Sequence, residues 1–197
     1  MKIKKIVIGL TLTSILFLGA CDIKKDDDKK IINKTSETNN SNKLDKKEVD
    51  ELGDYKGLKI GDTVSVKYAG IYKGKYSFDF TLNSLKYTNQ SLGGEEPEYE
   101  SGFIIADVTI LNTGKENLEM DTFSDITYGP TIFGYGKDYG FDSLDSEKEI
   151  KTGEKVTGKL VVGHSKTSNK IKQGLEGTTT TFSYDIKADE IGDYVPE

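Results

Sequence analysis

The stretch GFIIADVTILNTGKENLE, residues 102–119, decides the fold class. Apolar residues occupy every second position from Ile104 to Ile110, and the polar residues Asp107 and Thr109 lie between them. This alternation is typical of a β-strand with one buried face, because successive side chains of a strand point to opposite sides. The Asn-Thr-Gly triplet that follows has the composition of a tight turn. The stretch therefore predicts a half-buried strand that ends in a turn.

The same alternation recurs in four further segments. These are residues 64–68, 76–82, 156–162 and 182–186. Glycine-containing turns separate them, and no segment after residue 57 has a helical period over about ten residues. We therefore expect one all-β domain at residues 57–190, a sandwich or a barrel, followed by a short tail at residues 191–197. The residues expected to face its core are Phe80, Val108, Leu160 and Tyr184.

Three blocks of the chain resemble sequence found in extracellular lipoproteins of Gram-positive bacteria: Gly61–Val64, Gly102–Glu119 and Ile150–Val162. Together they resemble the telokin-like, immunoglobulin-like domain of unknown function, a family grouped with a secreted mycobacterial immunoprotective antigen. The resemblance covers about residues 58–187. It implies an immunoglobulin-like antiparallel β-sandwich and no catalytic residues. The chain departs from the family pattern at residues 84–101, which are longer and more acidic, and in a later Gly/Tyr-rich stretch.

The N-terminus has the pattern of an export signal. Three lysines precede an uncharged apolar run that is shorter than the ~20 residues of a membrane span. The run ends in Leu18-Gly19-Ala20-Cys21, which contains the only cysteine and resembles the lipobox of bacterial lipoproteins. That resemblance implies a signal peptide at residues 1–20, cleavage between Ala20 and Cys21, and a diacylglyceryl anchor on the Cys21 sulfur. The alternative is a plain secretion signal with an incidental cysteine.

Residues 21–56 are expected to form the lipidated N-terminus and a flexible, charged tether, because they contain too little apolar surface to fold alone. All 27 basic residues of the chain are lysines. Removal of residues 1–20 would leave 24 lysines against 33 acidic residues, a net charge of −9. This acidic balance, without any guanidinium group, disfavours nucleic acid as a partner.

The chain offers few residues for catalysis or metal binding. A Ser-His-Asp triad would have to use His164, the only histidine, which follows a predicted strand without a nucleophile elbow. A zinc site needs several His or Cys ligands, so no cofactor is expected. Abundant carboxylates leave a hydrolytic carboxylate pair open. Asp138, Asp142 and Asp145 are candidate calcium ligands, although their spacing differs from that of an EF-hand loop.

The Gly/Tyr-rich stretch at residues 128–141 is the candidate binding loop. Its glycines allow sharp turns, and tyrosine rings offer apolar contact area with a polar tip. The candidate binding residues are Tyr128, Phe133, Tyr135, Tyr139 and Phe141. The alternative is that these rings fold back and cover the core. The next candidate, for a cationic partner, is the acidic set Glu95, Glu96, Glu98 and Glu100.

These observations favour a lipoprotein on the outer face of a bacterial cell membrane that acts as a non-enzymatic binding or interaction module. Its expected partners are the membrane, through the lipid on Cys21, and an envelope protein or glycan. Two alternatives stay open: an envelope hydrolase that uses a carboxylate pair, and a purely structural surface antigen.

Overall fold

The structure is a computed structural model that describes residues 52–98 and 101–196. The expected signal peptide, Cys21 and nearly all of the expected tether lie outside these residues, as does Glu100. The helical elements of the described part are short 3-10 turns, namely η1 (Gly70–Tyr72), η2 (Met120–Phe123), η3 (Gly136–Tyr139) and η4 (Ala188–Glu190). The expected all-β class is therefore confirmed. Within residues 52–98 and 101–196, no helix has the length and apolar character needed to cross a membrane.

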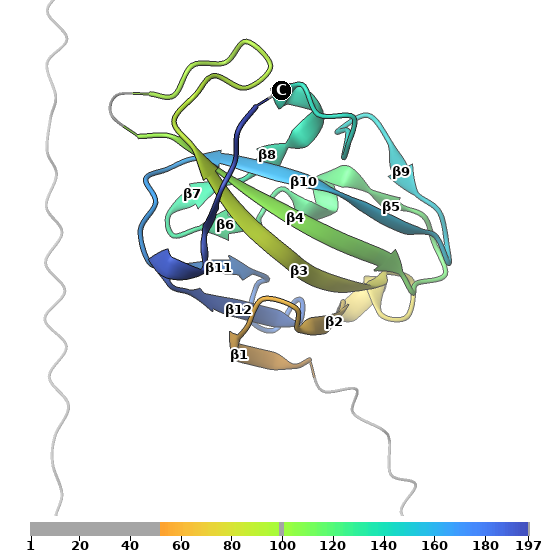
Figure 1. Ribbon diagram of the computed structural model, residues 1–197. Helices are drawn as coiled ribbons and strands as arrows, with labels where there is room; N and C mark the ends of the chain where they lie inside the picture. The colour runs from red at the N-terminus through yellow and green to blue at the C-terminus, as the bar shows by residue number, and fades with distance from the viewer. Residues whose placement is uncertain (1–51, 99–100, 197) are drawn as a thin grey trace, which may run out of the picture. The chain divides into compact units, whose positions relative to one another are not determined.

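Two sheets form an immunoglobulin-like sandwich. The six-stranded sheet contains, in order, β13 (Gly192–Asp193), β3 (Ser77–Thr88), β4 (Phe103–Asn112), β10 (Lys155–Gly163) and β8 (Gly134–Tyr135), and β2 (Thr63–Lys67) also pairs with β3. The five-stranded sheet contains, in order, β1 (Asp54–Leu58), β12 (Thr181–Ile186), β11 (Asn169–Gln173), β6 (Thr127–Tyr128) and β7 (Thr131–Ile132). A small separate sheet joins β5 (Leu118–Glu119) to β9 (Glu149–Ile150). In Figure 1 the long strands β3, β4 and β10 lie side by side, and β11 and β12 form a second layer.

The core lies between the two sheets. In the antiparallel register of β3 and β4, Phe80 is opposite Ile110, and Leu82 is opposite Val108. The Phe80 ring stacks on Phe182 of β12 with the ring centroids 5.3 Å apart, so this contact joins the sheets. The four residues expected to face inward are all buried, which confirms the expected register: Phe80, Val108, Leu160 and Tyr184.

Both ends of the domain extend beyond the expected boundaries. β1 begins at Asp54, inside the expected tether of residues 21–56, and pairs in parallel with β12. At the other end, Ile191 is buried and β13 pairs in parallel with β3, so the expected tail at residues 191–197 begins as part of the fold. The boundaries expected at residues 57 and 190 are therefore wrong, because short strands without a clear alternation pair with the outer strands of both sheets.

A second, smaller apolar cluster covers the outer face of the six-stranded sheet. Phe103, Ile105 and Val161 lie outside the main core and are still buried, together with Leu92. The covering side chains are Tyr139, Phe141 and Tyr194. The acidic loop after β3 (residues 89–98) approaches η3 so closely that a Cβ on Gly93 would lie 2.4 Å from the Tyr139 carbonyl carbon. The acidic loop and the Gly/Tyr-rich stretch, the two segments in which the chain departs from the family pattern, thus meet over this face.

Candidate functional site

The Gly/Tyr-rich stretch packs onto the domain instead of forming an exposed binding loop. Tyr128 and Phe133 are buried in the main core, with their ring centroids 6.3 Å apart. The Tyr128 hydroxyl donates a hydrogen bond to the Thr167 carbonyl at 2.6 Å. Neither side chain is available to a ligand, so the expectation that they form a binding surface is wrong. The alternative interpretation, in which the rings cover the core, holds because these rings gain more from burial than from solvent exposure.

The other three aromatic residues of the stretch are half-buried and are engaged within the domain. The Tyr135 hydroxyl donates to the Met120 carbonyl. The Tyr139 ring meets Phe103 edge-on at 5.5 Å between centroids. Phe141 meets the Tyr194 ring at 5.7 Å, with the Lys159 ammonium 5.4 Å from the Phe141 centroid. These contacts give Tyr135, Tyr139 and Phe141 a structural role.

We expect Tyr135→Ala to destabilise the domain by about 2 kcal/mol, because it removes a half-buried ring and leaves the Met120 carbonyl without its partner. Thermal or urea unfolding measures the effect. Ile132→Ala is the matched control, since this nearby side chain is 58% exposed, and its midpoint should stay unchanged. An unchanged midpoint for Tyr135→Ala would make this ring a binding candidate again.

In the described part of the chain, His164 and the three candidate aspartates have other surroundings than a catalytic triad or a calcium site would give them. The His164 ring packs edge-on against Tyr128 at 4.9 Å, and its Nδ1 lies 2.9 Å from the Ser165 carbonyl oxygen. Asp145 accepts a hydrogen bond from the Glu147 backbone N–H, as a turn residue does. Among residues 52–98 and 101–196, no three His, Cys, Asp or Glu side chains are grouped as a metal site requires, so Asp138 and Asp142 do not converge with Asp145.

The acidic loop contributes to a shallow hollow of about 430 Å³. Glu95, Glu96 and Glu98 line it, with Phe103 and Tyr139 among the apolar residues. These three glutamates are exposed, and their binding of a cationic partner stays a prediction. Phe103 and Tyr139 belong to the second cluster, so part of the apolar wall of the hollow already stabilises the fold.

A cluster of three tyrosines at the β2–β3 connection forms a more promising site. Tyr68, Tyr72 and Tyr76 follow one another at intervals of four residues. Tyr68 directly follows β2 and pairs with Thr179 in an isolated β-bridge. Tyr72 is the last residue of η1, and Tyr76 directly precedes β3. The Tyr72 carbonyl accepts the Tyr76 backbone N–H at 3.3 Å, so the turn brings the rings together. We call these three residues the tyrosine cluster.

The three rings contact one another at different inclinations. The Tyr68 and Tyr76 centroids are 6.1 Å apart with an interplanar angle of 69°, and those of Tyr72 and Tyr76 are 5.7 Å apart at 47°. Tyr72 is 46% exposed, and its neighbour Ile71 is 78% exposed. The cluster is thus partly exposed at the tip of a turn. The connection between β11 and β12 supports this turn, since the Ala69 N–H donates to the Thr178 carbonyl at 2.8 Å.

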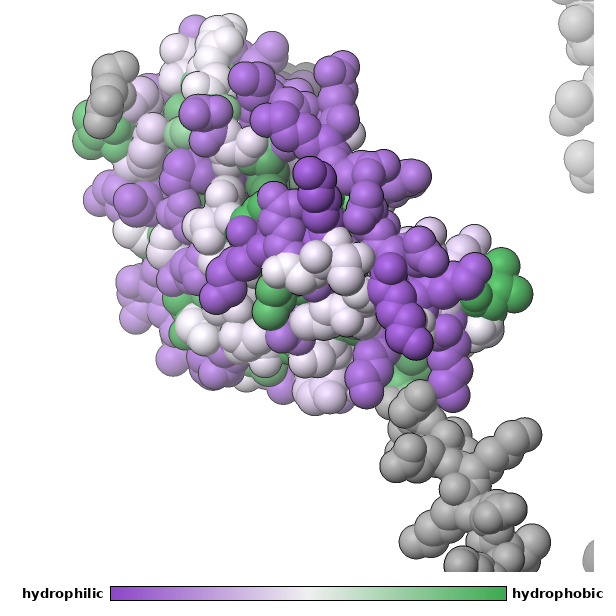
Figure 2. Space-filling model, turned by 90° about the vertical axis from the view of Figure 1, so that its right-hand side faces the viewer, coloured by the Kyte–Doolittle hydropathy of each residue, from purple (hydrophilic) through white to green (hydrophobic). Residues whose placement is uncertain are grey.

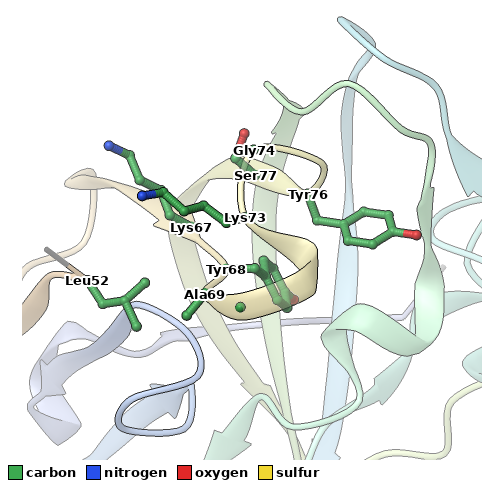
Figure 3. A pocket seen from close by; sticks show the side chains of 9 residues that line it. Leu52, Lys67, Tyr68, Ala69, Lys73, Gly74, Tyr76 and Ser77 are labelled. Carbon is green, nitrogen blue, oxygen red and sulfur yellow. The ribbon is translucent and has the colours of Figure 1, made fainter. Parts of the chain in front are cut away.

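Two hollows adjoin the tyrosine cluster. The basic hollow, of about 360 Å³, is shown in Figure 3, and Lys67, Lys73 and Ser77 supply its polar side chains. In that view Lys67 and Lys73 extend toward one side of the turn, and the Tyr76 ring extends toward the other. The acidic hollow, of about 310 Å³, is lined by Tyr68, Tyr72, Tyr76, Glu119, Asp121 and Thr122. The turn therefore separates a lysine-lined surface from a carboxylate-lined one.

The acidic wall is held in place by the core. Glu119 ends β5 and Asp121 lies in η2, whose Met120 and Phe123 side chains are buried. The Phe123 ring meets Phe78 edge-on at 5.0 Å. Because the alternate residues of this segment are anchored, the intervening carboxylates are kept on the surface next to the tyrosines. The position of the wall is therefore set by packing.

The environment of the cluster favours the neutral form of Tyr68. Burial raises the pKa of Tyr68 to about 12, and the nearby carboxylates of Asp125 and Asp121 act in the same direction. Burial likewise raises the pKa of Tyr128, Tyr135 and Tyr184 to about 12. The fold thus contains several phenols that stay protonated while folded.

The raised pKa values of these tyrosines predict that the domain unfolds at alkaline pH. A tyrosine in an unfolded chain has a pKa of about 10, so the raised values stabilise the fold fully below that pH. This contribution is lost as the pH rises from about 10 toward 12. We expect the tyrosinate absorbance to rise in that window together with loss of the β-sheet circular dichroism. Ionisation of all tyrosines near pH 10 with an intact sheet signal would contradict the prediction.

Sequence reasoning missed this site because Tyr68 and Tyr76 were assigned to alternating strands. The regular spacing of three tyrosines around a glycine-containing turn was the available signal. The carboxylates of Glu119 and Asp121 gave no such signal, because only the packing of β5 and η2 against the domain brings them beside the tyrosines.

Comparison with known proteins supports the fold. No family model and no curated protein matches the chain. Among solved structures, MPT63, a secreted protein from Mycobacterium tuberculosis, aligns with a TM-score of 0.50 and 12% identity over 69% of this chain and all of MPT63.

Two further solved structures align at lower TM-scores. An uncharacterised β-sandwich protein from Clostridium difficile 630 has a TM-score of 0.45 and 16% identity over 70% of this chain and 97% of that protein. YcdA from Bacillus subtilis, named as a candidate lipoprotein, has a TM-score of 0.40 and 19% identity over 57% of this chain and 38% of YcdA. This chain has two packed sheets with a buried core between them, and it aligns with MPT63 over the full length of that protein. It therefore shares the β-sandwich fold of that secreted protein.

Proposed function

We propose that this protein is a lipid-anchored, extracytoplasmic binding module that holds a ligand of the cell envelope at the tyrosine cluster and catalyses no reaction. The observation that carries the proposal is the pair of hollows on either side of an exposed aromatic turn. Concave sites lined by aromatic rings and a few polar groups are typical ligand sites. Exposed tyrosines are also frequent anchors of recognition surfaces.

The N-terminal sequence supports the proposed location. The Leu18-Gly19-Ala20-Cys21 string follows a basic start and a short apolar run, as in bacterial lipoproteins. MPT63, which has the same fold, is a secreted protein. A diacylglyceryl group supplies two acyl chains, and two chains anchor a protein stably to a membrane.

The face of the molecule drawn in Figure 2 favours a small ligand over a broad protein interface. Figure 2 shows one face of the molecule on which hydrophilic residues dominate and hydrophobic residues form small, separate patches. A stable protein–protein interface covers about 800 Å² on each partner, usually around an apolar centre. The hollows beside the tyrosine cluster, of about 360 and 310 Å³, suit a small molecule or one unit of a polymer.

Site-directed photo-crosslinking on living cells tests the proposed site. Ile71 is replaced by the photoreactive residue benzoyl-phenylalanine in the full-length protein, because its exposed side chain adjoins the cluster without lining either hollow. The control carries the same replacement at the exposed Ile132. We expect a discrete envelope adduct from position 71 alone. Adducts from position 132 alone, or from neither position, would overturn the proposal.

The anchor predicts a change of location in Cys21→Ala. Without the sulfur that accepts the diacylglyceryl group, the protein should leave the membrane fraction and accumulate as uncleaved precursor or in the medium. Fractionation followed by immunoblotting and intact mass measurement detects both products. A variant that is processed and fractionates like the parent protein would show that the cysteine is incidental to a plain secretion signal.

A further inference from the structure

We infer that the acidic hollow, lined by Tyr68, Tyr72, Tyr76, Glu119 and Asp121, is a cation cage that binds an organic ammonium group. The inference rests on the proposed function, because it names the ligand chemistry of the same site. Aromatic faces attract cations through the quadrupole of the ring, and cages of several aromatic rings recognise quaternary ammonium groups. Carboxylates next to such rings add direct charge attraction.

The three rings are inclined to one another and are not stacked in parallel. Tyr76 contacts both other rings, at interplanar angles of 69° and 47°. The rings therefore touch one another directly, and all three line the same hollow of about 310 Å³. The exposed Tyr72 forms the outer wall, and the more buried Tyr68 forms the inner one. A rounded apolar cation can contact several such faces at once.

The carboxylates that line the hollow have no lysine partner within residues 52–98 and 101–196. In the described part of the chain, no lysine ammonium lies within 4.0 Å of the Glu119 or Asp121 carboxylate. The fields of Asp121 and Asp125 both act on the Tyr68 phenol, where they help to raise its pKa, so these carboxylates lie close to the inner wall. A cation entering the hollow would therefore meet the carboxylates of Glu119 and Asp121 and the side chains of three tyrosines.

Other ligand classes fit this chemistry less well. Calcium takes six to eight oxygen ligands, and two carboxylates beside three ring faces supply too few. A phosphate or carboxylate would be repelled by Glu119 and Asp121. Lys67 and Lys73 line the other hollow and extend away from the Tyr76 ring (Figure 3). A neutral sugar could stack on the rings, but it would gain nothing from the charge. An organic ammonium group is attracted both by the aromatic rings and by the carboxylates.

Titration with choline tests the cage. Choline carries a trimethylammonium group, and dimethylbutanol is its uncharged carbon isostere with almost the same shape. We expect nuclear magnetic resonance titration of the purified protein to show saturable shifts at Tyr68, Tyr72 and Tyr76 with choline. Dimethylbutanol should bind at least about tenfold more weakly, and added salt should weaken choline binding because it screens the charges.

Four variants separate the contributions of ring and charge. Tyr72→Ala and Asp121→Asn should each weaken choline binding by about tenfold. Tyr72→Phe should retain most of the binding, because it keeps the ring face. Ile71→Ala is the matched control on the same turn and should bind like the parent protein. Since these side chains are exposed, the thermal midpoint should stay constant throughout, which separates lost binding from lost folding.

Each outcome supports or overturns the inference. Equal binding of choline and dimethylbutanol, or unchanged binding in Asp121→Asn, would overturn the cation cage and leave the proposed site standing. Absence of choline binding at the tyrosine cluster together with a position-71 envelope adduct would also overturn the cage alone. Absence of both choline binding and the position-71 adduct would overturn the proposed function itself.

Discussion

Phe80→Ala is expected to lower the free energy of unfolding by about 3–5 kcal/mol, the largest effect of any substitution considered for this domain. The Phe80 side chain is fully buried. Its ring stacks on Phe182 at 5.3 Å and lies 6.2 Å from the Tyr184 ring, so it joins β3 to the opposite sheet. Alanine would leave a cavity between the sheets that neither neighbour can fill. Urea unfolding monitored by tyrosine fluorescence measures the loss.

Asp79→Ala is the control for this prediction, because Asp79 is the preceding residue on the same strand. Its side chain points to the other face of β3 and accepts a hydrogen bond from the Ser65 hydroxyl at 2.6 Å. Surface contacts of this kind contribute about 0–1 kcal/mol. A loss at Asp79 as large as that at Phe80 would mean that the register of β3 is shifted by one residue.

Asn112→Ala is expected to cost about 3 kcal/mol or more, although it removes only a small polar side chain. Asn112 is 0% exposed at the end of β4. Its Nδ2 donates to the Glu116 and Ile150 carbonyls at 2.9 and 2.8 Å, and its Oδ1 accepts the Gly114 N–H at 2.9 Å. Alanine would remove the donor to the buried Ile150 carbonyl and the part-buried Glu116 carbonyl, and the acceptor of the buried Gly114 N–H.

Asn112→Asp sharpens the test, because it keeps the size and shape of the side chain but replaces the NH₂ donor by an oxygen that faces two carbonyls. At neutral pH it should destabilise the domain at least as much as alanine does. Asn117→Ala is the matched control, since its exposed side chain makes one hydrogen bond to Glu149 at 3.0 Å. If chemical denaturation gave the same stability for the Asn112 and Asn117 variants, the Asn112 side chain would not hold the β4 turn to β9.

The strands with a clear alternation could be predicted because each depends on its own residues. Val64 and Val66, for example, are buried on β2 while the residues between them are exposed, as their order in the sequence indicates. The prediction failed where a tertiary contact changes the period. In β3 the register shifts between Leu82 and Ser84, so that Leu82 and Leu85, three residues apart, both reach the core.

At the candidate site, the sequence likewise does not indicate which aromatic residues are exposed. The sequence marked the Gly/Tyr-rich stretch as unusual, and it is unusual, but composition does not distinguish a ring that binds a ligand from a ring that covers a core. Tyr128 is buried and Tyr72 is half-exposed, although both are tyrosines beside or near glycine. Only the packing of the whole domain determines which ring is left with a free face.

The sequence by itself determined the all-β class, the central strands and their inward faces, because alternation along a strand is a local property of the chain. It also provides the grounds for expecting an anchor at Cys21, since a lipobox is read as a linear string. The tertiary structure alone decided the ends of the domain, the cover over the second apolar cluster and the meeting of Glu119 and Asp121 with the tyrosine cluster. These features join segments that are distant in the chain, and their contacts form only when the whole domain folds.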